Sequence, residues 1–243
     1  GAIPFMYAFF TSCPLTETTD TFYPANGFLA RLNQVLPKRV SLLYVCSNPD
    51  GHAETDYYFA GQIRALEKAG FTLDSAVVLD GRNASDAGWL VASVNLIVLA
   101  GGHVPTQNAF FHRIHLCELL KSFDGVLIGI SAGSMNSAAE VYAQPEAAGE
   151  SISPDYVRFL PGLGLTNESI LPHYQLTRNA LLDGKRLFED ITYPDSMGRR
   201  FLVLPDGSYL FSQNDCQTLC GEAYRLADGV LTKICEDGAS ISL

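Results

Sequence analysis

A serine lies between glycines in the segment GISAG, residues 129–133. The segment matches G-x-S-x-G, the pattern of a nucleophile elbow, in which a sharp strand-to-helix turn exposes the serine hydroxyl. The apolar run 125–131 predicts the buried strand, and we expect a helix over about 132–143. The first N–H groups of that helix would favour an oxyanion beside Ser131. Ser131 could instead serve only as a helix N-cap, so other residues must separate these two interpretations.

A nucleophilic serine needs a general base, and His173 is the one histidine of five that follows Ser131 in the chain. It ends the apolar run in SILPHYQ, at the edge of the sheet where open α/β folds carry their sites. Asp206, in LVLPDGSY, also follows a predicted strand and could orient the base. Its alternative role is an ordinary Pro-Asp-Gly turn.

The order of these residues along the chain distinguishes between hydrolase folds. An α/β-hydrolase runs serine, acid, histidine, which here would require Asp155 as the acid before His173. That arrangement leaves the chain after His173 without a role. The order Ser131, His173, Asp206 places each residue at the end of a predicted strand, and we favour it.

A metal site is the other chemistry that the residue types could support. His112 and His115 lie three residues apart on a helix predicted over 105–123, near Cys117 and Glu118. This spacing can hold a metal, but no further ligand completes a set, and a solvated helix face is the favoured interpretation. We expect neither a metal nor an organic cofactor.

Strand-like and helix-like segments alternate through the first two-thirds of the chain. Continuous apolar runs favour a parallel sheet covered on both faces, and the alternation predicts a doubly wound α/β fold. The predicted strands are 6–10, 40–47, 76–80, 95–102 and 125–131, and the predicted helices are 25–36, 54–69 and the helix after Pro105.

The final third is predicted to add antiparallel strands to this core within one domain, 1–243. Residues 200–213 are interpreted as two strands joined by the turn at 205–207. Residues 218–238 carry a second hairpin signal at 227–229.

The composition limits the classes of partner. A net charge of −10 makes nucleic acid and anionic membrane surfaces improbable partners, and no apolar run has the length of a membrane span. The six scattered cysteines, without a CxxC pair, favour reduced thiols in a cytoplasmic protein. The segment 1–10 has no basic stretch of the kind that begins a secretory signal. Nothing in the sequence indicates the oligomeric state.

Three motifs together resemble the serine peptidase family of dipeptidase E and cyanophycinase. NLIVLAGGHVPTQNAFF resembles the family's strand that ends in Gly-Gly, and LIGISAGSM resembles its nucleophile elbow. LPHY and VLPDGSYL resemble its histidine and acid segments, so the likeness covers about residues 40–215. The resemblance implies a glutamine-amidotransferase-like fold: a three-layer αβα sandwich around a mostly parallel, flavodoxin-like sheet.

The resemblance also implies roles for individual residues. Ser131 would be the nucleophile, His173 the general base and Asp206 the orienting acid, although the family has a glutamate at this last position. The N–H groups of Gly102 and Ala132 would form the oxyanion hole.

The remaining implied roles concern the substrate. Gly101 and His103 would line the substrate site, although His103 stands where the family usually has asparagine. Arg178 would hold an N-terminal aspartate side chain of the substrate, and its alternative role is a solvated charge. A second arginine of the family is replaced by Leu181, which makes strict aspartate specificity doubtful.

The sequence therefore predicts a serine peptidase that hydrolyses short peptides, including those with N-terminal aspartate, through an acyl-enzyme. Two alternatives stay open. The same triad could serve an esterase or amidase, or the fold could be a binding protein that keeps the elbow as structure.

Overall fold

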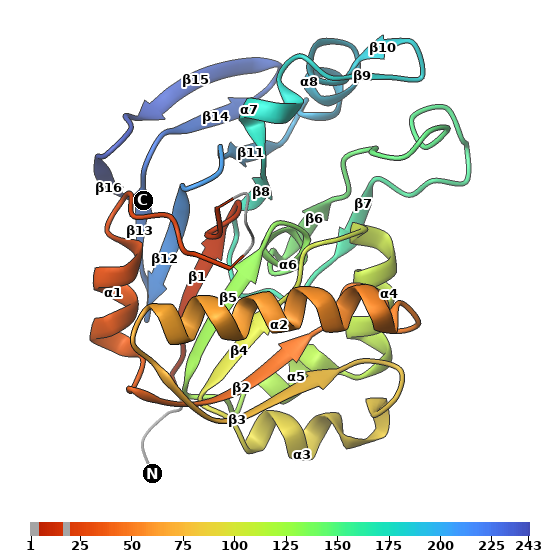
Figure 1. Ribbon diagram of the computed structural model, residues 1–243. Helices are drawn as coiled ribbons and strands as arrows, with labels where there is room; N and C mark the ends of the chain where they lie inside the picture. Colours follow the sequence, from red (N-terminus) through yellow and green to blue (C-terminus); the bar gives the residue numbers. More distant parts are fainter. Residues whose placement is uncertain (1–4, 17–19) are drawn as a thin grey trace.

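A central sheet of eight strands forms the body of the molecule in this computed structural model, which describes residues 5–16 and 20–243 (Figure 1). Five neighbouring strands are parallel, and the other three extend the sheet in antiparallel fashion. The order across the sheet is β16 (Ser240–Ser242), β13 (Cys216–Cys220), β12 (Tyr209–Gln213), β1 (Tyr7–Thr11), β5 (Val126–Ile130), β4 (Leu96–Leu99), β2 (Arg39–Val45) and β3 (Thr72–Leu79).

Helices cover both faces of this sheet. The strand side chains alternate between two apolar clusters; in β2, for example, Leu42 and Tyr44 enter one cluster while Leu43 and Val45 enter the other. One face packs against α1 (Phe28–Val35) and α2 (His52–Lys68), the other against α3 (Ala87–Ala92), α4 (Val104–Arg113) and α5 (Leu116–Leu120). The predicted mixed α/β fold, with a mostly parallel central sheet flanked by helices, is confirmed.

A second, smaller sheet lies beside the central sheet, in the upper part of the view in Figure 1. It contains β8 (Ser169–Leu171), β11 (Arg200–Val203), β14 (Ala223–Ala227) and β15 (Val230–Cys235). The predicted hairpin at 227–229 is present, since β14 pairs antiparallel with β15 and both turn residues have positive φ. The two strands predicted within 200–213 also exist, but β11 and β12 enter different sheets. The turn at 205–207 therefore joins two sheets.

Two expected helices differ from the prediction. The helix expected over 132–143 ends as α6 (Ala132–Met135), because the following residues pair with other segments: the Ala139 N–H donates to the Thr166 carbonyl oxygen, and 140–142 form a strand paired with 159–161. The helix expected over 105–123 is divided into α4 and α5 by His115, which has a φ of 54°.

Short elements complete the chain and surround the carboxyl ends of the parallel strands. They are η1 (Ala84–Asp86), β6 (Glu140–Tyr142), β7 (Phe159–Pro161), α7 (Tyr174–Thr177), β9 (Leu181–Leu182), β10 (Lys185–Arg186), the π-helical turn Leu187–Thr192 and α8 (Tyr193–Asp195). All six cysteines have free thiols. Across 5–16 and 20–243, no helix has both the length and the apolar character needed to cross a bilayer.

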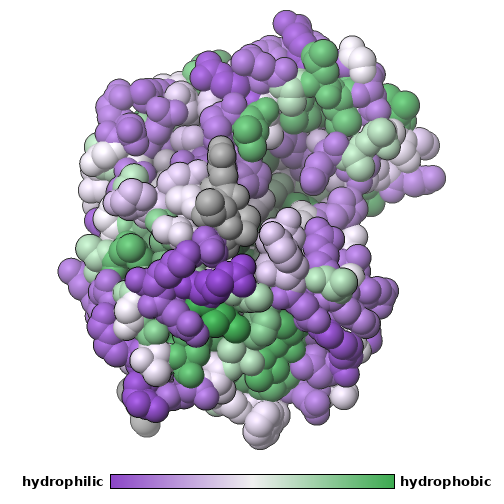
Figure 2. Space-filling view, in the orientation of Figure 1, coloured by the Kyte–Doolittle hydropathy of each residue, from purple (hydrophilic) through white to green (hydrophobic). Residues whose placement is uncertain are grey.

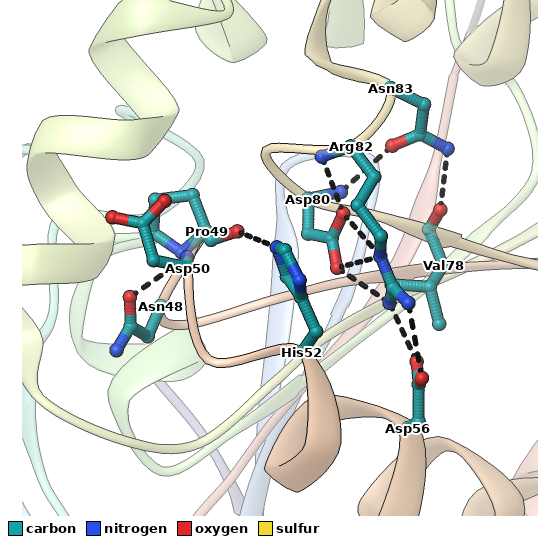
Figure 3. Close-up of polar contacts among 9 residues, drawn as sticks. All are labelled: Asn48, Pro49, Asp50, His52, Asp56, Val78, Asp80, Arg82 and Asn83. Atoms are coloured by element: carbon teal, nitrogen blue, oxygen red, sulfur yellow. Dashed lines mark hydrogen bonds and ion pairs between the residues drawn. The ribbon is translucent and has the colours of Figure 1, made fainter.

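An ion-pair cluster joins the end of β3 to α2, next to the loop between β2 and α2 (Figure 3). The Arg82 guanidinium contacts the carboxylates of Asp80 and Asp56 at 2.8 and 2.7 Å. Asp80 is buried after the end of β3, whereas Asp56 is exposed on α2. The Pro49 carbonyl in the loop accepts a hydrogen bond from the Gly81 N–H at 3.0 Å. This loop follows the carboxyl end of β2, and the hydrogen bond from Gly81 ties it to the segment after β3.

Candidate active site

Ser131 follows β5 directly and has a strained backbone. Its φ of 52° and ψ of −109° are unfavourable for a residue with a side chain, at a cost on the order of 1–3 kcal/mol. The Ser131 carbonyl accepts hydrogen bonds from the N–H groups of Ser134 and Met135, and these two bonds form the first turn of α6. The segment is thus a strand–turn–helix elbow with the serine at its tip, as the G-x-S-x-G pattern predicts.

The two glycines of the motif let α6 pack directly on the sheet. A Cβ on Gly133 would lie 2.3 Å from the Leu99 carbonyl oxygen of β4. A Cβ on Gly129 would lie 2.9 Å from the backbone nitrogen of Ser134 in α6. Both distances are shorter than any van der Waals contact, so a side chain at either position would push the helix and its serine out of place.

Ser131, His173 and Asp206 form a continuous hydrogen-bonded chain. The Ser131 Oγ lies 2.7 Å from His173 Nε2, and His173 Nδ1 lies 2.7 Å from Asp206 Oδ1. Ser131 belongs to the central sheet, His173 follows β8 of the second sheet, and Asp206 lies in the turn between β11 and β12. Asp155, the acid of the rejected order, is exposed on a separate loop. The structure therefore brings together the three residues in the predicted order.

Two further residues fix this chain, and the sequence analysis missed both. The buried Ser12 hydroxyl donates to Asp206 Oδ1 at 2.7 Å and accepts the His173 backbone N–H at 2.8 Å. The Gln175 amide donates to Asp206 Oδ2 at 2.7 Å, while its oxygen accepts the Asp206 backbone N–H. The position of Ser12 directly after the strand Tyr7–Thr11 was the available signal, since residues at that edge face the site.

These contacts keep Asp206 ionised. Burial raises the pKa of the Asp206 carboxyl, but hydrogen bonds from His173, Ser12 and Gln175, together with the charge on His173, lower it below its usual value overall. The carboxylate is thus suited to hold the His173 imidazole in one tautomer and to stabilise its protonated form.

The Gly101-Gly102 loop lies against the elbow. A Cβ on Gly101 would lie 3.4 Å from Ser131 Cβ, so the two backbones nearly touch. Gly102 has a φ of 149°, and a Cβ there would lie 2.2 Å from the Ser47 Oγ. Within the described part of the chain, the N–H groups of Gly102 and Ala132 have no hydrogen-bond acceptor. They are available to a ligand, as an oxyanion hole requires.

His103 makes two hydrogen bonds of its own. Its Nδ1 lies 2.7 Å from Thr106 Oγ1, and its Nε2 lies 2.7 Å from Glu150 Oε2. The other Glu150 oxygen accepts the backbone N–H groups of Glu146 and Ala147, each at 2.9 Å. His103 was predicted to bind substrate, but its ring nitrogens are both engaged, and its contacts tie the loop after β4 to residues 146–150.

A cavity of about 220 Å³ opens beside the Ser131 hydroxyl. Most of its lining is apolar, and within 5–16 and 20–243 the one carboxylate in the lining comes from Glu146. Figure 2 shows hydrophobic residues on the lobe that carries α7, β9 and β10, above a hollow in the surface. The lining residues are Gly102, Val104, Ser131, Met135, Gln144, Pro145, Glu146, Pro172, His173, Thr177, Ala180, Leu181, Leu182 and Leu187.

Arg178 does not reach this cavity. Its side chain is exposed, and its guanidinium carbon lies 5.3 Å from the centre of the Tyr174 ring, a cation–π distance. Leu181 lines the cavity instead. The structure thus assigns an apolar side chain, rather than an arginine, to the wall beside Thr177.

The histidine pair of α4 and α5 lies away from the site. His112 and His115 line a separate cavity with Cys117 and Glu118, and His112 Nε2 lies 3.0 Å from the Pro161 carbonyl. Over 5–16 and 20–243, no group of three or more histidine, cysteine, aspartate or glutamate residues could hold a metal ion.

The fold of this chain is similar to that of solved peptidase structures. A peptidase from an acI-B1 actinobacterium superposes with a TM-score of 0.63 at 17% identity, over 99% of this chain and 97% of that one. A candidate peptidase E protein from Listeria monocytogenes EGD-e gives a TM-score of 0.56 at 15% identity, over 96% of this chain and 100% of that one. No protein-family profile and no curated protein sequence matches the chain. The described part of the chain therefore has a mixed α/β fold like that of these peptidases.

Proposed function

We propose that this protein is a serine peptidase that hydrolyses short peptides through Ser131, His173 and Asp206. The observation that carries the proposal is the hydrogen-bonded chain from the Ser131 hydroxyl through His173 to the Asp206 carboxylate. The likeness of the fold to solved peptidases supports it.

The proposed reaction follows from the positions of the three side chains. The Ser131 Oγ attacks the scissile carbonyl carbon while His173 Nε2 takes the hydroxyl proton. The carbonyl oxygen becomes an oxyanion, which the N–H groups of Gly102 and Ala132 stabilise. His173 then protonates the leaving amine as the carbon–nitrogen bond breaks, and an acyl-enzyme remains on Ser131. Water, deprotonated by His173, hydrolyses the ester and releases the acid.

The helix after the serine contributes less than the sequence predicted. Since α6 has only four residues, its aligned peptide dipoles are few, and the oxyanion depends mainly on the two N–H groups. One of these is supplied by Gly102 on the opposite loop, whose fixed position against Ser47 is then a requirement for catalysis.

The cavity of about 220 Å³ beside Ser131 offers room for one residue of a substrate next to the scissile bond. A preference for N-terminal aspartate remains a prediction without support here. Among the described residues, no lysine or arginine lines the cavity, and the one carboxylate would repel an aspartate side chain.

A panel of dipeptides and p-nitrophenyl esters, together with a fluorophosphonate probe, tests the proposal. The wild-type enzyme should hydrolyse peptides and be labelled at Ser131, whereas Ser131→Ala should lose both properties and keep its fold. Ser122→Ala, at an exposed serine remote from the cavity, is the matched control and should behave as wild type. Unchanged peptide hydrolysis in Ser131→Ala would overturn the triad. Ester turnover without any peptide turnover would select the esterase alternative, and the absence of labelling would select a binding protein.

A further inference from the structure

We propose that Glu146 binds the α-ammonium group of the substrate, so that the enzyme acts on peptides with a free amino terminus and an apolar first residue. The inference rests on the proposed peptidase function and names its substrate class. It assigns the cavity two regions: a carboxylate for the amine, and an apolar wall for the side chain of the same residue.

The position of Glu146 is the first part of the argument. The Glu146 side chain lines the cavity together with Ser131 and His173. In a peptide cleaved after its first residue, the α-nitrogen is only two bonds from the scissile carbonyl carbon. Its partner must therefore share the cavity of the nucleophile, and among the described residues that line the cavity Glu146 is the only one with a carboxylate.

The Glu146 carboxylate is also free to bind a cation. It accepts no hydrogen bond from any residue in the described ranges, whereas the neighbouring Glu150 is bonded to His103 and to two backbone N–H groups. Partial burial raises the pKa of Glu146, and the charge on Glu150 adds to this effect, while His103 and His173 oppose it. Glu146 is exposed as a whole residue, so its carboxylate is accessible, and an ammonium group would form a charge-assisted hydrogen bond with it.

The backbone that carries Glu146 is held in place. The Glu150 carboxylate fixes the backbone N–H of Glu146, and His103 anchors Glu150 to the Gly101-Gly102 loop. Two side-chain hydrogen bonds, His103 to Glu150 and Glu150 to the Glu146 N–H, thus join the amine site to the loop that carries the Gly102 N–H. This connection fixes the position of Glu146 relative to the oxyanion hole, which is the spacing that a bound peptide has to match.

The apolar wall decides against a cationic side chain as the partner of Glu146. Eight of the lining residues are apolar: Val104, Met135, Pro145, Pro172, Ala180, Leu181, Leu182 and Leu187. A lysine or arginine side chain would place its charged group as well as its methylene groups inside this small, mainly apolar cavity, and burying the charge costs free energy. A leucine-sized side chain buries its surface against this wall while the α-ammonium group meets the carboxylate.

The test compares Leu-p-nitroanilide with its N-acetylated form in wild type, Glu146→Gln and the control Glu67→Gln, which removes an exposed charge on α2. In wild type we expect kcat/KM to be higher for the free amine than for the acetylated substrate and for Asp-p-nitroanilide. Glu146→Gln should lower kcat/KM for the free amine about 10- to 100-fold, the range of a charged hydrogen bond, and leave the acetylated substrate unchanged. Glu67→Gln should change neither.

Three results would overturn the proposal. In Glu146→Gln, kcat/KM could fall equally for free and acetylated Leu-p-nitroanilide, or fall for neither. Alternatively, the wild type could prefer N-acetyl-Lys-p-nitroanilide to Leu-p-nitroanilide. Calorimetry with the Ser131→Ala protein separates this failure from failure of the proposed function. That protein should bind Leu-Leu more tightly than N-acetyl-Leu-Leu, and adding Glu146→Gln should abolish the difference. If the wild type hydrolyses no peptide yet this binding difference appears, the amine site stands and the peptidase function falls.

Discussion

Ser131 and His173 meet at 2.7 Å through their side chains, and both have positive backbone φ angles, 52° and 61°. Positive φ in non-glycine residues is uncommon, and such residues cluster where a side chain has to be aimed at a particular point. Here Ser131 directly follows β5 of the central sheet, and His173 lies two residues after the end of β8 in the second sheet. The strain turns both side chains toward the same place.

Replacing Ser131 should separate the cost of this strain from the loss of activity. Ser131→Ala and Ser131→Gly both remove the nucleophile and should both be inactive. Since glycine tolerates the Ser131 conformation and alanine does not, we expect Ser131→Gly to be the more stable of the two by about 1 kcal/mol. Chemical denaturation of both variants measures the difference. Equal stabilities, or a more stable alanine variant, would show that the turn is not strained.

The contact between Gly102 and Ser47 gives a second prediction. Gly102→Ala places a Cβ 2.2 Å from the Ser47 Oγ, which must displace the loop and its N–H group. We expect kcat to fall about 10²- to 10³-fold, the usual effect of losing one oxyanion donor. Gly102→Ala combined with Ser47→Gly removes the clash but keeps the unfavourable φ, so it should recover part of the activity. If the double variant has no higher kcat than Gly102→Ala alone, steric displacement by the added Cβ is not the cause of the lost activity.

Substitution of Gly133 tests the packing of α6 on the sheet. Gly133→Ala would place a Cβ 2.3 Å from the Leu99 carbonyl oxygen, in fixed backbone. We expect the free energy of unfolding to fall by about 2–4 kcal/mol, together with most of the activity. Gly164→Ala is a useful comparison, because no atom lies within 4 Å of its added Cβ and only its φ of 69° is unfavourable. Thermal and chemical denaturation should rank Gly133→Ala as the more destabilised protein.

The acid response of the protein should depend on Asp206. Its pKa is lowered in the folded state, so the carboxylate stabilises the fold at pH values above the ordinary aspartate pKa of about 3.9. This stabilisation is lost as the pH falls through the lower, folded pKa. Asp206→Asn should therefore flatten the decline of unfolding free energy below about pH 4. It should also lower kcat about 10³- to 10⁴-fold, because the imidazole loses its orienting acid. If the unfolding free energy of Asp206→Asn declines below about pH 4 as steeply as that of the wild type, other carboxyl groups cause the acid destabilisation.

Ser12 should act by positioning the catalytic side chains. Ser12→Ala removes the hydroxyl shared by Asp206 and the His173 backbone, so we expect a loss of about 1–2 kcal/mol in stability and a smaller kcat with nearly constant KM. Losing this donor should also raise the pKa of Asp206, which NMR titration of the carboxyl carbon can follow. A purely structural role would change stability and leave that pKa where it is.

Much of the fold and the core of the site could be predicted from the sequence because they depend on local signals. Apolar runs marked the parallel strands, and strand ends marked Ser131, His173 and Asp206. The order of the three along the chain then excluded Asp155. These features share one physical basis, since the carboxyl ends of parallel strands meet at one edge.

Other features depend on contacts between distant segments and have no local signal. Ser12 lies 194 residues from Asp206, and Glu150 lies 47 residues from His103. The early end of α6 follows from the pairing of residues 139–142 with Thr166 and with residues 159–161, which no helical pattern indicates. The substrate role expected of Arg178 came from a resemblance, and the structure places an apolar wall where that residue was expected to act.

The turn at 205–207 connects a strand of one sheet to a strand of the other, and this connection affects the order of events during folding. Each sheet supplies part of the triad, and Asp206 belongs to the crossing between them. The 2.7 Å contacts can exist only after both sheets have formed and docked in their final alignment. During refolding, secondary structure should therefore return before catalytic competence, and recovered turnover would report the docking step rather than the formation of either sheet.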